Sequence, residues 1–81
     1  MAKRPIQASI FRKHEEVRKA YYSRMTTAMN RSVEFAIWDC FPGDVIVISM
    51  RESGLEIATC KVRIGGKLDI QWAEWISKEL R

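Results

Sequence analysis

The sequence predicts a single α+β domain in the order helix, strand, strand, strand, helix. Two observations lead to this fold class. Apolar residues recur at helical spacing between Ser9 and Asn30, and from Val33 onward they recur every second residue. The chain has 81 residues, of which 47% are hydrophobic and 30% charged. Residues 1–81 therefore suffice for one domain and are too apolar for intrinsic disorder.

Residues 1–7 are expected to form a flexible basic arm. Pro5 follows four residues that show no apolar pattern, and Lys3 and Arg4 supply the positive charge.

A long amino-terminal helix is predicted over residues 9–30. No Gly or Pro interrupts this stretch, and Ser9 is a suitable N-cap. At about 100° per residue, the apolar positions fall on one side of a helix within roughly 80°. These positions are Ile10, His14, Val17, Tyr21, Met25 and Ala28.

Three antiparallel strands are expected to follow as a meander. Residues 33–38 alternate apolar and other side chains, which is typical of a half-buried strand. Residues 45–50 are apolar on both faces, which predicts a central strand covered on both sides. Residues 55–64 change the parity of their apolar positions near Ile57 and Ala58, which predicts a β-bulge or the start of a strand there. Pro42-Gly43 and Gly54 mark the two connecting turns.

The segment after Gly65-Gly66 allows two interpretations. A three-residue turn through Lys67 would pair Ile64 with Leu68 and add a short fourth strand. Alternatively, a helix begins near Asp69 or Ile70, and we favour this interpretation because aspartate is a good N-cap. Both interpretations make residues 72–80 helical.

Charge is distributed unevenly along the chain. The net charge is +4, but residues 1–31 carry eight Lys or Arg against two Glu, whereas residues 32–81 carry six against eight acidic residues. A basic first third of this kind favours an anionic partner.

We therefore expect a non-catalytic protein that binds DNA or RNA through its first helix and arm. On a helix, Lys13, Arg24 and Arg31 would lie within about 20° of one another and form a basic ridge roughly 27 Å long. Such a ridge can contact phosphates. The candidate nucleic-acid contacts are Lys3, Arg4, Arg12, Lys13, Arg24, Arg31, Lys61 and Arg63.

The alternative is a protein-interaction or regulatory module, either a homodimer or a small accessory protein of the type found in phages and plasmids. Its expected partner-binding residues are Trp38, which has strand parity opposite to Val33, and Phe41, which lies at a loop tip. Aromatic residues are frequent anchors of protein interfaces.

Catalysis, metal binding and cofactor binding are not expected. His14 is the only histidine, and the segment from His14 to Arg18 lacks the second histidine of a His-Glu-x-x-His zinc motif. We expect His14 to lie in the core or an interface. Asp39 and Asp44 flank the Pro-Gly loop, where capping is a more frequent role than acid–base catalysis.

Cys40 and Cys60 are expected to be free thiols at strand positions. Two cysteines without C-x-x-C spacing do not make a disulfide scaffold. No secretory signal follows Met1, and no apolar run approaches the roughly 18 residues of a membrane span. We therefore expect a cytoplasmic protein with neither a membrane nor a small-molecule substrate as its partner.

Overall fold

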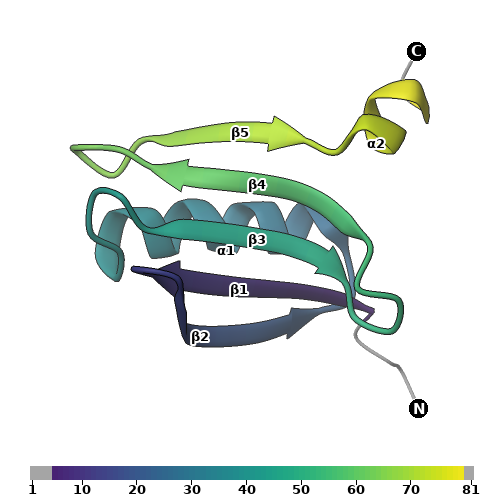
Figure 1. Ribbon diagram of the computed structural model, residues 1–81, viewed down its shortest axis with the longest axis horizontal. Coiled ribbons are helices and arrows are strands. Elements are labelled where there is room, and N and C mark those ends of the chain that lie inside the picture. Colours follow the sequence, from purple (N-terminus) through teal and green to yellow (C-terminus); the bar gives the residue numbers. More distant parts are fainter. Residues whose placement is uncertain (1–4, 80–81) are drawn as a thin grey trace.

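A five-stranded antiparallel sheet with a helix on one face forms the protein (Figure 1). The computed structural model describes residues 5–79, with side chains as far as Ile76. In chain order the elements are β1 (Ile6–Arg12), β2 (Glu15–Tyr22), α1 (Met25–Trp38), β3 (Val45–Met50), β4 (Glu56–Val62), β5 (Leu68–Trp72) and α2 (Glu74–Glu79). The strands lie in the order β2-β1-β3-β4-β5. The predicted order of helix, three-stranded meander and helix is therefore wrong.

The predicted helix over residues 9–30 is instead a β-hairpin followed by the start of α1. Ile6, Ala8 and Ile10 alternate toward the core, which is the period of a strand. The hairpin turns at Lys13 and His14, whose φ angles are 52° and 69°. This turn contains neither Gly nor Pro, so the sequence gives no sign of the chain reversal. The expected arm also shrinks, because Ile6 and Gln7 belong to β1.

The predicted strand over residues 33–38 lies within α1. The residues that face the sheet are small and four apart, namely Ala28, Ser32 and Ala36, and this spacing is helical. Small side chains allow the helix to approach the sheet closely. The Ser32 hydroxyl donates a hydrogen bond to the Ala28 carbonyl oxygen at 2.8 Å, which satisfies this buried polar group within the helix.

The centre of the sheet agrees with the prediction. β3 has the predicted bounds and lies between β1 and β4. The register pairs Ile48 with Ala58 and Ser49 with Glu56, which leaves Ile57 as the extra residue of a β-bulge. The predicted bulge is thus confirmed. The expected cover on both faces of β3 is wrong, because helix α1 lies on one side only (Figure 1).

The segment after Gly65-Gly66 is a strand, so the favoured helix start near Asp69 is wrong. β5 pairs with β4, with Val62 opposite Leu68 and Cys60 opposite Ile70. This register differs by two residues from that of the alternative fourth strand, which placed Ile64 opposite Leu68. A Cβ atom added to Gly66 would lie 3.1 Å from the Ile37 Cα atom in α1. Glycine at position 66 therefore lets the β4–β5 turn rest against the helix.

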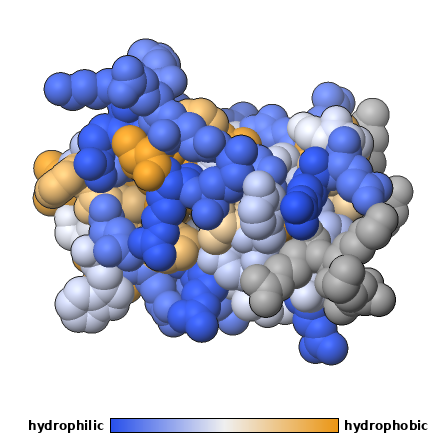
Figure 2. Space-filling view, turned by 90° about the horizontal axis from the view of Figure 1, so that it is seen from below, coloured by the Kyte–Doolittle hydropathy of each residue, from blue (hydrophilic) through white to orange (hydrophobic). Residues whose placement is uncertain are grey.

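The hydrophobic core lies between α1 and one face of the sheet. Its centre is formed by Ile46, Ile48, Ala58 and Cys60, which have no solvent exposure. Alternation along the strands sends the neighbouring residues to the opposite face, which no described helix covers (Figure 1). Figure 2 views the molecule from the β2 edge, where hydrophilic side chains predominate and hydrophobic ones gather toward the end that carries the β1–β2 turn.

Candidate nucleic-acid interface

The uncovered side of the sheet, which we call the open face, is the broadest candidate site. The strand registers place on it every second residue of each strand. Its members are Gln7, Ser9, Phe11, Glu16, Lys19, Tyr21, Val45, Val47, Ser49, Glu56, Thr59, Lys61, Asp69 and Gln71. The open face is thus a mixture of apolar, aromatic, hydroxyl, amide, acidic and basic groups.

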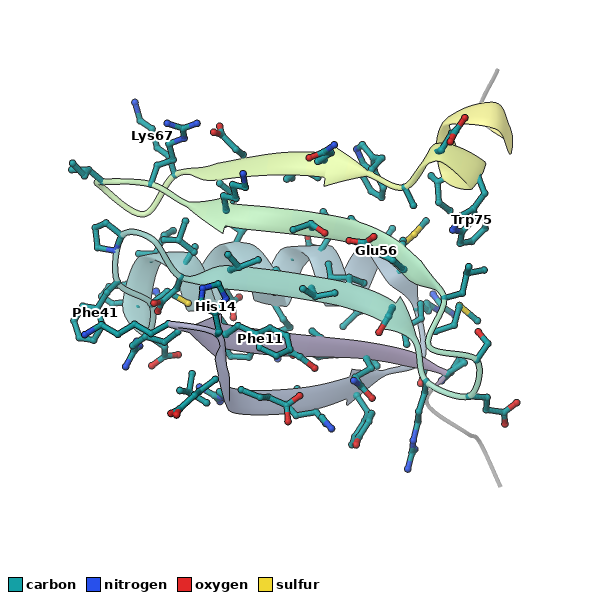
Figure 3. All side chains as sticks on the ribbon, in the orientation of Figure 1. Phe11, His14, Phe41, Glu56, Lys67 and Trp75 are labelled. Atoms are coloured by element: carbon teal, nitrogen blue, oxygen red, sulfur yellow. The ribbon has the colours of Figure 1, made fainter. Side chains whose placement is uncertain are left out.

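An apolar hollow lies at one end of the open face. It has a volume of about 450 Å³ and is lined by Phe11, Lys13, His14, Gly43, Val45 and Val47. Figure 3 shows Phe11 and His14 beside each other at this end of the sheet. Phe11, Val45 and Val47 are each half-buried, so part of every side chain remains available to a ligand. The Phe11 ring beside the Lys13 ammonium group suits the stacking of a planar group.

A second, smaller hollow of about 180 Å³ lies on the β4–β5 side of the open face. Thr59, Lys61, Arg63, Asp69 and Gln71 contribute to its lining. Arg63 donates a hydrogen bond to Asp69 and forms an ion pair with it, so this hollow combines paired and unpaired charge.

Five cationic side chains of the described residues form no ion pair, namely Lys13, Arg24, Arg51, Lys61 and Lys67, and the three lysines lie on or beside the open face. Within residues 5–79, no ion pair is formed by Lys13 at the β1–β2 turn, by Lys61 on β4 or by Lys67 at the β4–β5 turn. Figure 3 shows Lys67 at the same end of the molecule as Phe11 and His14. Lys19 lies on the open face but is paired with Glu16 at 3.5 Å. Lysines without a carboxylate partner can neutralise phosphate groups.

Arg12 ties the β1–β2 hairpin to the loop of residues 40–44. Its Nη2 atom lies 3.0 Å from Oδ2 of the buried Asp44, and its guanidinium lies 4.4 Å from the centre of the Phe41 ring. The Phe41 N–H donates a hydrogen bond to Asp44 at 2.9 Å. The hydrogen bond from Arg12 lowers the pKa of Asp44, and it raises the pKa of Arg12 in turn. Arg12 thus supports the edge of the apolar hollow, and the predicted capping role of Asp44 is confirmed.

The predicted basic ridge does not exist, because its members lie on different elements. Lys13 is in the hairpin turn, Arg24 precedes α1 as its N-cap, and Arg31 lies on α1 and is paired with Glu34 at 2.8 Å. Arg24 and Arg31 line a separate hollow with Tyr21, Tyr22, Ser23 and Thr27. Lys3 and Arg4 lie outside the described residues. Of the predicted contacts, the structure brings Lys61 and Arg63 together on the open face and places Lys13 beside its apolar hollow.

The two predicted partner-binding aromatics lie at the carboxyl end of α1 and in the loop that follows. Trp38 is 81% exposed and Phe41 is 62% exposed. Trp38 ends the helix, so its predicted position on the uncovered sheet face is wrong. Phe41 lies in the loop, as predicted, under the Arg12 guanidinium.

The last residues singled out from the sequence are His14, Cys40 and Cys60. His14 is exposed in the turn, so the expectation of a core histidine is wrong. Cys40 and Cys60 are both free; Cys60 is a core residue of β4, whereas Cys40 follows α1 and not a strand. Burial raises the pKa of Cys60 to about 11, which makes its thiol unreactive at neutral pH. Among residues 5–79, no group of three or more His, Cys, Asp or Glu side chains is placed to hold a metal ion.

Sequence reasoning missed Phe11, Val45, Val47 and Lys67 as members of the site. The signal was present in the alternation of residues 6–11, where Gln7, Ser9 and Phe11 occupy the positions opposite the core residues. Reading the same residues at helical spacing concealed it.

Comparison with protein families, with curated proteins and with solved structures finds no match to this chain. Neither helix of residues 5–79 has the length and apolar content that crossing a lipid bilayer requires. The function is therefore argued from the geometry of the open face.

Proposed function

We propose that the protein binds single-stranded nucleic acid on the open face of its sheet, without catalysing a reaction. The observation that carries the proposal is the combination of an apolar hollow containing Phe11 with the unpaired Lys13, Lys61 and Lys67 around the same face. Bases stack on aromatic side chains while cationic side chains contact the phosphates. A protein acting in this way is expected in the cytoplasm, where its partner is accessible.

The width of the open face favours single strands over duplexes. Five strands spaced by about 4.8 Å form a surface roughly 20 Å wide, whereas the major groove of B-DNA is about 12 Å wide and admits a two-stranded ribbon. The bases of a single strand can instead be splayed over a flat sheet. The exposed Gln71 amide offers hydrogen bonds to exposed base edges. Gln7 and Thr59 donate their hydrogen bonds to Ser9 and Glu56 on the same face.

The experiment is a fluorescence-anisotropy titration with labelled oligothymidylate, its RNA counterpart and a duplex of the same length. We expect the single strands to bind more tightly than the duplex. With three lysines engaged, log K should fall with log salt at a slope of about −2. Equal binding of duplex and single strand, or no binding at low salt, contradicts the proposal.

A matched pair of variants tests where binding occurs. Lys61→Gln removes an unpaired charge from the open face and should lower the salt slope by about 0.7. Arg31→Gln removes a charge from α1, away from the open face, and should leave affinity and slope unchanged. If Arg31→Gln weakens binding and Lys61→Gln does not, the interface lies on the helix side of the sheet.

The exposure of Trp38 favours a protein partner as a second candidate function. An indole that is 81% exposed at the end of a helix is an unusual use of a large hydrophobic side chain. Trp38 and Phe41 would then anchor the partner. Under this alternative Trp38→Ala abolishes co-purification of a defined partner, whereas nucleic-acid affinity stays the same.

A further inference from the structure

The outer edge of β5 carries backbone groups without hydrogen-bond partners in the sheet. The Lys67 carbonyl oxygen accepts a hydrogen bond from Arg63, and the Ala73 N–H donates one to Ile57, so these two residues turn their backbone groups toward β4. Alternation along the strand turns the N–H and C=O groups of Leu68, Ile70 and Trp72 the other way. Because β5 is the last strand of the sheet, these groups face outward.

We propose that a second copy of this chain pairs with β5, antiparallel and about a two-fold axis at Ile70. In this register Ile70 lies opposite Ile70 of the second copy, and Leu68 lies opposite Trp72 in both directions. Each of these three pairs exchanges two N–H···O bonds, which gives six across the junction. The proposal goes beyond nucleic-acid binding and does not depend on it.

The side chains of β5 are complementary to themselves in this register. On the helix side, Ile70 is 41% exposed and Trp72 is 38% exposed, and pairing places them against apolar residues of the second copy. On the open face, Asp69 lies opposite Gln71 of the second copy, so an amide can donate to a carboxylate at two symmetric positions. The paired segment ends at Trp72, before α2 begins at Glu74.

The other edge of the sheet is unsuited to such pairing. β2 carries Glu15, Glu16, Arg18 and Lys19 in succession, and a register shift in the β1–β2 pairing leaves Val17 as an extra residue. Charged side chains and bulges are devices by which edge strands resist association. β5 has neither device along Leu68–Trp72, apart from the Asp69 carboxylate, which Arg63 neutralises.

Pairing at β5 would join two open faces into one continuous surface. A two-fold axis perpendicular to the sheet keeps directly opposed residues on the same face, so both hollows lined by Lys61 and Arg63 lie beside the junction. The assembly would be a ten-stranded sheet with α1 of both copies on its other side.

The test is sedimentation velocity of the full chain, without nucleic acid, over a concentration series. We expect a reversible monomer–dimer equilibrium. Gln71→Glu places a carboxylate opposite Asp69 at two positions and should raise the dimer dissociation constant about fivefold. Gln71→Lys creates two opposite-charge contacts and should lower it about fivefold. Both substitutions are at an exposed side chain, and unchanged melting temperatures at low concentration confirm that both variants fold.

Val17→Glu on the β2 edge is the matched control and should leave the dissociation constant unchanged. A chain that stays monomeric at every concentration overturns the proposal. Dimerisation that responds to Val17→Glu, or that moves in the same direction for both Gln71 variants, overturns it as well. Because no nucleic acid is present, these outcomes are distinct from failure of the proposed function.

Discussion

Alternate residues of each strand lie on the two faces of the sheet, and the two faces differ in how far their side chains are buried. On β3, Ile46 and Ile48 point toward α1 and have no solvent exposure, whereas Val45 and Val47 point to the open face and are half-buried. The covered face holds the core, and the open face retains apolar surface that no described helix covers. The effects of a substitution on stability and on binding are therefore expected to depend on which face of the sheet the residue occupies.

The largest effect is expected from shortening a side chain on the covered face. Ile48→Ala leaves a cavity at the centre of the core and should lower the free energy of unfolding by about 3 kcal/mol. Val47→Ala, one residue earlier and on the open face, should cost only about 1 kcal/mol because its side chain is partly exposed. Urea denaturation of both variants measures the difference, and equal losses would contradict a one-sided core.

The next effect concerns the contact between the β4–β5 turn and α1. Gly66→Ala forces a left-handed backbone, with a φ angle of 76°, onto alanine and brings its Cβ atom against Ile37, so we expect a loss of about 2 kcal/mol. Gly65 has a φ angle of 83° but open space around it, so Gly65→Ala should cost about 1 kcal/mol. Thermal denaturation compares the two, and a larger loss for Gly65→Ala would exclude the helix contact as the cause.

A smaller effect is expected for the ion pair between Arg12 and Asp44, which supports the edge of the apolar hollow. Asp44→Asn retains an acceptor for the Phe41 N–H but loses the ion pair with Arg12, so stability at pH 7 should fall by about 1.5 kcal/mol. Folding lowers the pKa of Asp44, so its stabilising contribution is present above the ordinary aspartate pKa of about 3.9 and is lost as pH falls through the lowered value.

Unfolding free energies of wild type and Asp44→Asn, measured from pH 7 downward, should therefore converge in acid. A difference that stays constant with pH would show that the carboxylate charge contributes nothing.

The smallest expected change is in binding alone. Phe11→Leu keeps an apolar side chain in the hollow but removes the ring on which a base can stack, so affinity for oligothymidylate should fall about fivefold. The melting temperature should change little, because Phe11 is on the open face. Anisotropy titration measures the loss, and unchanged affinity would exclude stacking at this position.

The sequence predicted the carboxyl-terminal half of the sheet better than the amino-terminal half. β3 and the bulge at Ile57 were recoverable because β-branched residues and a change of parity are unambiguous local signals. Most of residues 9–22 form strands where a helix was predicted, whereas residues 25–30 are helical as predicted and residues 33–38 are helical where a strand was predicted. Ile6, Ala8 and Ile10 alternate over too few residues to outweigh a helical pattern, and Lys13-His14 turns without Gly or Pro.

The site could be predicted only in part, because its residues come from five strands whose register is not specified by local periodicity. Lys61 on β4 and Arg63, which directly follows β4, were found from their outward parity. Phe11, Val45 and Val47 form one hollow only because β1 pairs with β3. These strands are separated in sequence by β2 and α1, and no short motif signals such a long-range pairing.

The open face is the proposed surface of contact with nucleic acid, and a nuclear magnetic resonance titration of ¹⁵N-labelled protein with unlabelled oligothymidylate tests this directly. We predict that amide shifts concentrate at Phe11, Val47, Thr59 and Lys61. Residues of α1 such as Ala28 and Val33 should remain unperturbed. Shifts confined to α1, or a spectrum unchanged by the oligonucleotide at low salt, would contradict this assignment.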